Sequence, residues 1–316
     1  MSEVDWLSHL LKMITVTGQL EVRCAYGAPW RVAWPRSAAH EIPYHVVLKG
    51  RAILEDPETK TVRELAGGDV VLLPHGSAHV LHDGSGITPG PTFNRQRPAG
   101  WTLSANDGQG ERLDMLCGHF FIGPPHDRLM RNYLPTNLVV RAMDGDAGVE
   151  SASNQLASLV GLMRMESASD KLGGNAMLNA LSAALFTVVL RAATEAEQVP
   201  EGLLALAGHP RLAPAVSAMF AEPARTWTLV DLADLCGMSR ATFMRRFQDT
   251  LGRSAADLLT DIRMSLAANA LKKPEAGTEA VAELVGYQSV SAFRRVFAER
   301  MGMTPGQWRR LVHDGA

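Results

Sequence analysis

The stretch LADLCGMSRATFMRRFQDTLGRSAADLL, residues 232–259, recurs in outline as VAELVGYQSVSAFRRVFAERMGMTPGQW, residues 281–308. The second copy contains one extra residue, Gln288, just after its turn. The aligned pairs are Leu232 and Val281, Gly237 and Gly286, Ser239 and Ser289, Phe243 and Phe293, and Phe247 and Phe297. Two copies are too few for a stacked repeat protein. The pattern therefore predicts a two-helix unit that has been duplicated.

Each copy has the residue order of a helix-turn-helix. A short apolar helix is expected to end at Gly237 or Gly286, because glycine accepts the positive φ of a sharp turn. Ser239 and Ser289 are well suited to cap the helix that follows. Two phenylalanines stand four residues apart in that second helix and therefore share one buried face. The remaining residues of the second helix must face outward.

The outward face of the second helix is cationic in both copies, because neither 239–247 nor 289–297 contains an acidic residue. Arginine donates two hydrogen bonds to guanine and also pairs with phosphate, so such a face suits the major groove of DNA. A solvated helix face would explain one copy, but repetition of the caps and glycines favours a DNA interface. The candidate DNA-binding residues are Ser239, Arg240, Ala241, Met244, Arg245, Arg246, Ser289, Val290, Ser291, Arg294 and Arg295.

These features resemble the AraC family of transcription regulators over residues 226–312. RMSLAANALKK, residues 263–273, resembles the helix that joins the two units, and GMTPGQWRR, residues 302–310, resembles the closing signature. Tyr287 stands where that family usually has an aromatic residue. The resemblance implies that the two cationic helices enter successive major grooves on one face of DNA. Ala241 and Met244 depart from the larger or polar readers usual there, so the first unit is expected to make apolar contacts, for instance with thymine methyl groups.

Residues from about 15 to 122 predict a β domain. Short β-type runs such as YHVVLKGRAILED, residues 44–56, and RLDMLCGHFFIG, residues 112–123, are separated by turn residues. Regular short runs of this kind are typical of a barrel or sandwich. Residues 84–110 are rich in Gly, Pro, Ser and Asn and are expected to form a long loop.

GDVVLLPHGSAH, residues 68–79, resembles the second motif of cupins, and HEIPYHVVLKG, residues 40–50, resembles the end of the first. The usual His-x-His pair is missing, and Pro43 stands near the place of the metal-binding glutamate. His45 has the same strand parity as that position and is expected to point into the barrel. His45 and His79, with His75 or His40 nearby, could bind a divalent metal, since imidazole suits zinc, nickel, copper and iron. They could equally be hydrogen-bonding residues of a pocket or core.

Three widely spaced cysteines, Cys24, Cys117 and Cys236, argue against a disulfide framework or a zinc knuckle. Within the AraC family, the N-terminal half resembles members whose sensor has a leading "PW" and a "CG" near its end, here Pro29-Trp30 and Cys117-Gly118. Some relatives of that kind respond to oxidants through cysteine. That resemblance makes Cys24, Cys117 and Trp30 candidate effector or redox residues, although inert buried thiols remain open. Cys236 is expected to be a buried residue that contributes only to core packing.

Residues from about 127 to 222 predict helices, because 152–167 and 175–195 keep apolar residues at three-to-four spacing. These two helices either complete a core or form a dimer seam. We therefore expect an α+β chain in three parts. A cupin-like β-barrel sensor covers 1–126, a helical linker and dimerisation region covers 127–222, and an all-α domain with two helix-turn-helix units covers 223–316.

The net charge of −2 does not by itself indicate a nucleic-acid partner. Residues 201–316 carry 14 Lys and Arg against 12 Asp and Glu, whereas residues 1–200 carry 17 against 21. The N-terminus lacks the basic start and apolar stretch of a signal peptide, and the longest apolar run, 178–190, is too short to span a bilayer. We therefore expect a cytoplasmic protein with no membrane partner.

The leading hypothesis is a sequence-specific transcription regulator, not an enzyme, controlled by a small-molecule, metal or redox signal in its N-terminal domain. The resemblance implies that its partners are double-stranded DNA, a small-molecule or oxidant effector, RNA polymerase and a second copy of the chain. The alternative is a cupin-type metal-dependent enzyme fused to a DNA-binding module, which would need three or four well-placed ligands. An architectural DNA binder is disfavoured, because it would not need a domain with a pocket.

Overall fold

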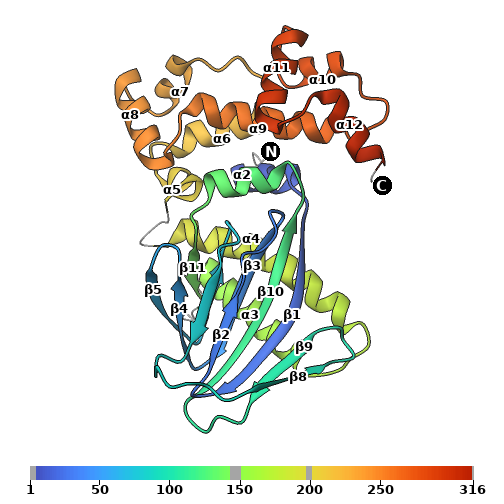
Figure 1. Cartoon of the computed structure of the whole chain (residues 1–316). Coiled ribbons are helices and arrows are strands. Elements are labelled where there is room, and N and C mark those ends of the chain that lie inside the picture. Colours follow the sequence, from blue (N-terminus) through green and yellow to red (C-terminus); the bar gives the residue numbers. More distant parts are fainter. Residues whose placement is uncertain (1–4, 143–150, 197–200, 315–316) are drawn as a thin grey trace. The chain divides into compact units, whose positions relative to one another are not determined.

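A computed structural model of the chain describes residues 5–142, 151–196 and 201–314 (Figure 1). The chain divides into two compact units, each described here by itself. The β unit comprises Val16–Gly123 and Leu134–Pro200, and the helical unit comprises Met1–Thr15, Pro124–Tyr133 and Glu201–Ala316. These boundaries differ from those expected at 126/127 and 222/223, because the expected linker is divided between the two units. Its first long helices pack with the strands, and its last ones pack with the helix-turn-helix units.

The β unit consists of two sheets. The larger has strand order β11-β6-β3-β10-β1-β9-β8, and the smaller has order β2-β7-β4-β5. The strands are β1 (Val16–Gly27), β2 (Arg31–Trp34), β3 (Glu41–Lys49), β4 (Arg51–Asp56), β5 (Thr61–Ala66), β6 (Asp69–Leu72), β7 (His79–His82), β8 (Thr92–Gln96), β9 (Thr102–Asn106), β10 (Arg112–Ile122) and β11 (Leu138–Arg141). Two facing sheets of short strands are the arrangement expected of a cupin-like domain, so the predicted fold class is confirmed.

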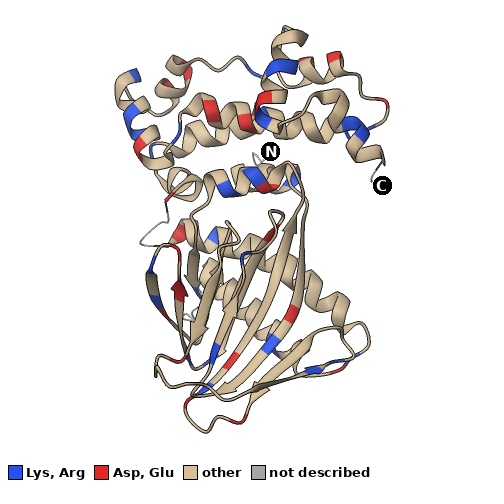
Figure 2. Ribbon diagram, in the orientation of Figure 1, with Lys and Arg blue, Asp and Glu red and all other residues tan. Residues whose placement is uncertain are grey.

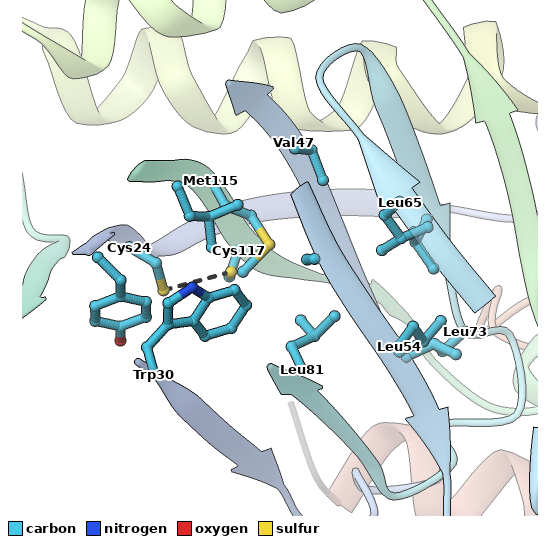
Figure 3. Close-up of a cluster of buried hydrophobic side chains, with 13 residues drawn as sticks. Cys24, Trp30, Val47, Leu54, Leu65, Leu73, Leu81, Met115 and Cys117 are labelled. Carbon is cyan, nitrogen blue, oxygen red and sulfur yellow. Dashed lines mark hydrogen bonds between the residues drawn. The ribbon is translucent and has the colours of Figure 1, made fainter. Parts of the chain in front are cut away.

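The space between the two sheets is filled with side chains (Figure 3). The larger sheet contributes buried residues such as Val47 and Met115, and the smaller sheet contributes Leu54, Leu65 and Leu81. Both sheets point alternate residues inward, which gives a close-packed apolar interior. The two candidate redox cysteines, Cys24 and Cys117, lie within this interior.

Helices α3 (Ala152–Ser167) and α4 (Gly174–Glu195) cover the outer face of the larger sheet (Figure 1). The Tyr44 and Ser182 hydroxyls are 2.8 Å apart, and the rings of Phe120 and Phe186 meet edge to face at 5.2 Å. These helices therefore complete a core, one of the two roles left open above. Among the described helices, α4 alone is long and apolar enough to cross a membrane, by length and composition only. Its apolar residues are explained by its buried face, which packs on the sheet.

The expected loop over residues 84–110 contains a β-hairpin instead. Strands β8 and β9 pair in antiparallel fashion, and the turn between them is closed by hydrogen bonds that join Arg97 with Gly100 and with Trp101. β9 also pairs in parallel with β1, which places the hairpin at the edge of the larger sheet. The prediction of a loop was wrong because turn-forming residues fill the segment, while its strands are held by pairing with residues far away in sequence.

The helical unit is built around the duplicated two-helix motif. Its helices are α1 (Trp6–Met13), α2 (His126–Tyr133), α5 (Leu203–Gly208), α6 (Ala213–Ala221), α7 (Leu229–Leu235), α8 (Arg240–Leu251), α9 (Ala255–Ala270), α10 (Thr278–Leu284), α11 (Val290–Met301) and α12 (Pro305–Asp314). The pair α7–α8 is the first helix-turn-helix, α10–α11 is the second, and α9 joins them (Figure 1). The Trp308 indole N–H donates to the Ala268 carbonyl at 3.0 Å and fixes α12 on α9.

The turns of both motifs form as the sequence predicts. Gly237 and Gly286 have φ values of 57° and 82°, in the left-handed region that favours glycine. The Ser239 hydroxyl accepts a hydrogen bond from the Thr242 amide, and the Ser289 hydroxyl accepts one from the Ala292 amide, both at 3.3 Å. Each second helix therefore begins at a capped and fixed position.

Candidate DNA interface and thiol–imidazole site

The second helices of the two motifs, α8 and α11, bury their phenylalanines and expose their arginines. Phe243 and Phe247 are at most 1% exposed, and Phe293 and Phe297 are fully buried. Of the candidate DNA-binding residues, all are exposed except Val290, which is partly buried. The buried rings therefore fix the rotation of each helix, and this rotation turns the candidate readers outward.

The arginines of these faces are free to bind an anionic partner. Within the described part of the chain, the guanidinium groups of α8 and of Arg294 and Arg295 make no ion pair and no hydrogen bond. Figure 2 shows Lys and Arg on both α8 and α11. Unpaired exposed cations on a capped helix suit contacts with phosphate and with base edges.

The first motif differs from the second in having an apolar groove beside the candidate DNA-binding residues of α8. A cavity of about 650 Å³ is lined mainly by apolar atoms of α8 and of the start of α9, and its lining includes Ala241, Met244 and Arg245. Met244 is 53% exposed. The corresponding residue of the second motif is Arg294. The candidate DNA-binding faces of the two motifs therefore expose different chemistry.

In the β unit, the buried side chains of Cys24, Cys117, His45 and His79 contact one another in that order and form a thiol–imidazole chain. Cys24 Sγ lies 3.9 Å from Cys117 Sγ (Figure 3), and Cys117 Sγ lies 3.1 Å from His45 Nδ1. His45 Nε2 lies 2.7 Å from His79 Nε2, and His79 Nδ1 lies 2.9 Å from the Ser77 carbonyl oxygen. Each of the four side chains is 1% exposed.

Strand pairing explains why these residues meet. Cys117 on β10 is directly opposite His45 on β3, and Cys24 on β1 is a diagonal neighbour of Cys117 on the adjoining strand. His79 lies on β7 of the smaller sheet, so its contact with His45 joins the two sheets. Trp34 stacks on the His79 ring with a centroid distance of 6.2 Å and holds that ring in place.

Trp30 and Gly118 support the thiol pair without joining the chain. Trp30 is 2% exposed and stacks on Tyr26 at 5.6 Å, in the cluster that contains both cysteines (Figure 3). A Cβ at Gly118 would overlap the Gln19 carbonyl and the Tyr44 hydroxyl. The glycine after Cys117 therefore lets β1 approach β10 closely.

Burial shifts the pKa values of the groups in the thiol–imidazole chain. It lowers the pKa of His45 well below its ordinary value and also lowers the pKa of His79, so both rings are neutral at neutral pH. It raises the pKa of the Cys117 thiol well above its ordinary value. The hydrogen bond with Cys117 lowers the pKa of Cys24. Cys24 is therefore the thiol of the pair that ionises more readily.

Of the four histidines considered as metal ligands, only His45 and His79 come together. His75 lies away from the thiol–imidazole chain, with its Nε2 3.0 Å from the Leu134 carbonyl oxygen. His40 is exposed on the surface. Over residues 5–142, 151–196 and 201–314, no group of three or more His, Cys, Asp or Glu side chains is placed to hold a metal ion. The predicted His45, His79 and His75 set needs correction, because the turn that carries His75 aims it at the backbone after α2.

Sequence reasoning placed His45 inside the barrel and both cysteines in strands, but it missed their contact with each other. No local pattern encodes it, because the pairing of β3 with β10 joins residues 72 positions apart. It also missed Trp34. This residue lies on β2 directly opposite His79 on β7, and the pairing of these two strands brings them together.

Residues 5–195 match the family described as "Cupin", and residues 232–311 match the family described as "Helix-turn-helix domain". The chain belongs to the AraC family of transcription regulators, with a cupin N-terminal domain. Three relatives are each 28% identical to this AraC-type regulator over nearly the whole length of both chains. They are an uncharacterized HTH-type transcriptional regulator of Haemophilus influenzae (98% of this chain, 99% of the relative), the RCS-specific HTH-type transcriptional activator RclR of Escherichia coli (98% and 99%), and the HTH-type transcriptional regulator MtrA of Neisseria gonorrhoeae (97% and 98%). The regulator therefore binds DNA through its helix-turn-helix domain, as the sequence predicts.

Proposed function

We propose that this AraC-type regulator senses a two-electron oxidant through Cys24 and Cys117. The observation that carries the proposal is the 3.9 Å separation of the two sulfurs in a buried cluster. A disulfide needs the sulfurs to approach to about 2 Å, so bond formation requires only a local shift of the two adjoining strands. The printed name of RclR, an RCS-specific activator, also supports control by a chemical signal.

The proposed signal leaves the thiol pair along β10. This strand ends at Ile122, and the chain then enters α2, which packs in the helical unit. The Tyr133 hydroxyl donates to Asp261 at 2.6 Å, and His126 Nε2 lies 3.0 Å from Asn269 Oδ1. Both partners lie on α9, the helix that joins the two motifs. Movement of β10 on disulfide formation can therefore bias the DNA-binding helices through α2, provided that the two states differ in free energy of DNA binding.

The proposed DNA complex places α8 and α11 in successive major grooves. Its readers are the exposed residues named above, and their lack of internal ion pairs supports this role. At a promoter the proposed partner is RNA polymerase, and we propose that the protein acts in the cytoplasm, where its DNA target lies.

We also propose a homodimer that forms through α3 and α4. Leu162, Met165 and Met177 on these helices are 43%, 58% and 45% exposed, and they leave apolar surface that a second copy would cover. A second copy would cover the same patch on both chains, as in a two-fold interface. Replacing Met165 with glutamate is expected to lower the sedimentation coefficient to that of a monomer, while exchange of the isolated exposed Val62 leaves it unchanged.

The test of the redox proposal is DNA binding with and without oxidant. Wild type is expected to change its affinity for a genomic target on treatment with hydrogen peroxide or hypochlorous acid, and to revert on addition of dithiothreitol. The double variant Cys24→Ser, Cys117→Ser is expected to keep one affinity throughout, and Cys236→Ser serves as the control. A double variant that still responds like wild type would rule the proposal out.

We propose that the chain is not an enzyme, because its relatives are named as transcription regulators over their whole length. The competing function is a metal-dependent cupin enzyme fused to the DNA-binding domain. Metal analysis of purified protein separates the two. Stoichiometric metal that is lost in both His45→Ala and His79→Ala would support the enzyme and contradict the regulator-only proposal.

A further inference from the structure

The thiol–imidazole chain has a direction that the hydrogen bonds fix. The Ser77 carbonyl oxygen can only accept, so His79 must carry its hydrogen on Nδ1. A neutral His79 then has a bare Nε2, which must accept from His45 Nε2–H. His45 in turn has a bare Nδ1, which faces the Cys117 thiol at 3.1 Å.

We infer that His45 is the general base that takes the Cys117 proton as the disulfide forms, and that His79 relays a proton from His45 to the surface. This inference rests on the proposed redox function and adds to it the residues that make disulfide closure possible in a buried site. His45 is the catalytic residue, because it touches a reacting sulfur, and His79 acts through it.

The reaction balances in two steps. Cys24 attacks the oxidant and becomes a sulfenic acid, with release of water from hydrogen peroxide or of hydrogen chloride from hypochlorous acid. The Cys117 sulfur then attacks the Cys24 sulfur, the S–O bond breaks, and the S–S bond forms. The Cys117 proton moves to His45 Nδ1, and the His45 Nε2 proton moves to His79 Nε2. His79 is then an imidazolium, and it passes its Nδ1 proton to water once the hydrogen bond from Nδ1 to the Ser77 carbonyl breaks. The departing hydroxide takes up one proton, so the sum of the second step is a disulfide and one water.

The environment of the chain favours this direction of transfer. A neutral base is required, and His45 is neutral because burial lowers its pKa. An unassisted thiol would react slowly, because burial raises the pKa of Cys117 and keeps it protonated. A low pKa at His45 also means that the ring does not retain the proton, which must therefore be passed on.

The far end of the thiol–imidazole chain borders two cavities at His79, whose side chain is itself only 1% exposed. This residue lines two cavities, one of about 240 Å³ together with Ser77 and one of about 200 Å³ together with Trp34. Either cavity is roomy enough for the water that accepts the proton. The titratable and charged groups that line these cavities or act on the chain are Glu21, Tyr26, Arg36, Glu41, Asp56, Arg63, Asp114 and His119.

Intact-mass kinetics after a pulse of oxidant test the inference on the full-length protein. The sulfenic acid adds one oxygen, and the disulfide loses two hydrogens, so the two steps are counted separately. Wild-type closure is expected to be nearly independent of pH between about pH 6 and pH 8, because a neutral base is present throughout. In His45→Gln the sulfenic acid is expected to accumulate, and closure is expected to speed up about tenfold per pH unit, as the Cys117 thiolate becomes available only through its own ionisation.

Two further variants complete the experiment. His79→Gln is expected to slow closure less than His45→Gln, because water can replace the relay. His75→Gln, whose ring faces the Leu134 carbonyl outside the chain, is expected to match wild type. Formation of the sulfenic acid at the wild-type rate shows that the His45 variant keeps its folded thiol pair.

The outcomes separate the two proposals. Closure in His45→Gln with the wild-type rate and pH profile would overturn the relay and leave the redox function standing. A wild-type protein that never loses the two hydrogens would overturn the redox function itself. Metal bound stoichiometrically to Cys117 in the purified protein would also overturn the relay, because the proton in question would be absent.

Discussion

The two helix-turn-helix motifs agree in what they bury and differ in what they expose. Both have a positive-φ glycine, a serine cap and a fully packed phenylalanine pair. Outward, Met244 of α8 is replaced by Arg294 in α11, and Ala241 is replaced by Ser291. Duplication has therefore preserved the packing that positions each helix, while the surface that we propose meets DNA has diverged.

The anchoring of the two reading helices differs as well. Arg300 in the last turn of α11 pairs with Asp257 at 2.6 Å and with Asp261 at 3.3 Å, both on α9. Its equivalent in α8 is Thr250, which has no charge. Arg128 of α2 donates to the Arg300 carbonyl at 3.1 Å. Arg253, just after α8, likewise donates to Asn132 of α2 at 3.4 Å, so both motifs contact the segment that we propose carries the signal.

The largest expected effect tests the buried phenylalanine packing that the two motifs share. Phe247→Ala and Phe297→Ala are each expected to destabilise the helical unit by about 3–5 kcal/mol, because a large buried ring is removed from a close-packed site. Chemical denaturation followed by circular dichroism measures the change. Phe93→Ala is the control, since that ring is 52% exposed. If only one of the two variants lost stability, the conclusion that both motifs depend on the same packing would be wrong.

The next effect tests the divergent surfaces. Arg245→Ala and Arg295→Ala are each expected to weaken binding to the cognate site by about 1–3 kcal/mol if the side chain is bidentate to a base. Salt titration distinguishes the alternative, because loss of a phosphate contact lowers the slope by about 1 and weakens all sequences alike. Unchanged affinity in both variants would defeat the assignment of the reading faces.

A smaller effect comes from the caps of the first helix in each motif. Thr228 and Asp231 form a reciprocal capping box at the start of α7, with bonds of 3.1 Å and 2.9 Å. Thr228→Ala is expected to reduce the free energy of unfolding by about 1 kcal/mol. Thermal unfolding measures it, and Thr228→Ser is the conservative control. An unchanged melting temperature would mean that this cap does not stabilise the motif.

The smallest effect is expected at the equivalent position of the second motif. Gly277 caps α10 without a side-chain hydrogen bond. Gly277→Ser is expected to stabilise the unit by only a few tenths of a kcal/mol, since glycine is nearly as good a cap as serine. A difference scan against wild type measures this gain. A clear loss of stability would show that the backbone here requires glycine.

The motifs could be predicted from the sequence because their determinants are local. Gly237, Ser239 and Phe243 lie within seven residues and are repeated 49 or 50 positions later. The thiol–imidazole chain could be predicted only in part, since its members come from four strands of two sheets. Strand parity showed that His45 points inward, but which strand lies opposite depends on the pairing of the whole sheet. The same reason explains the incorrect choice of His75.

The most direct test of the account is a hydroxyl-radical footprint of the full-length protein on a genomic target. The account predicts two protected patches on one face of the duplex, about one helical turn apart for each copy of the chain. Arg245→Ala should weaken protection mainly in one patch and Arg295→Ala mainly in the other. A single patch, or two patches that respond alike to both variants, would contradict the claim that α8 and α11 read adjacent grooves.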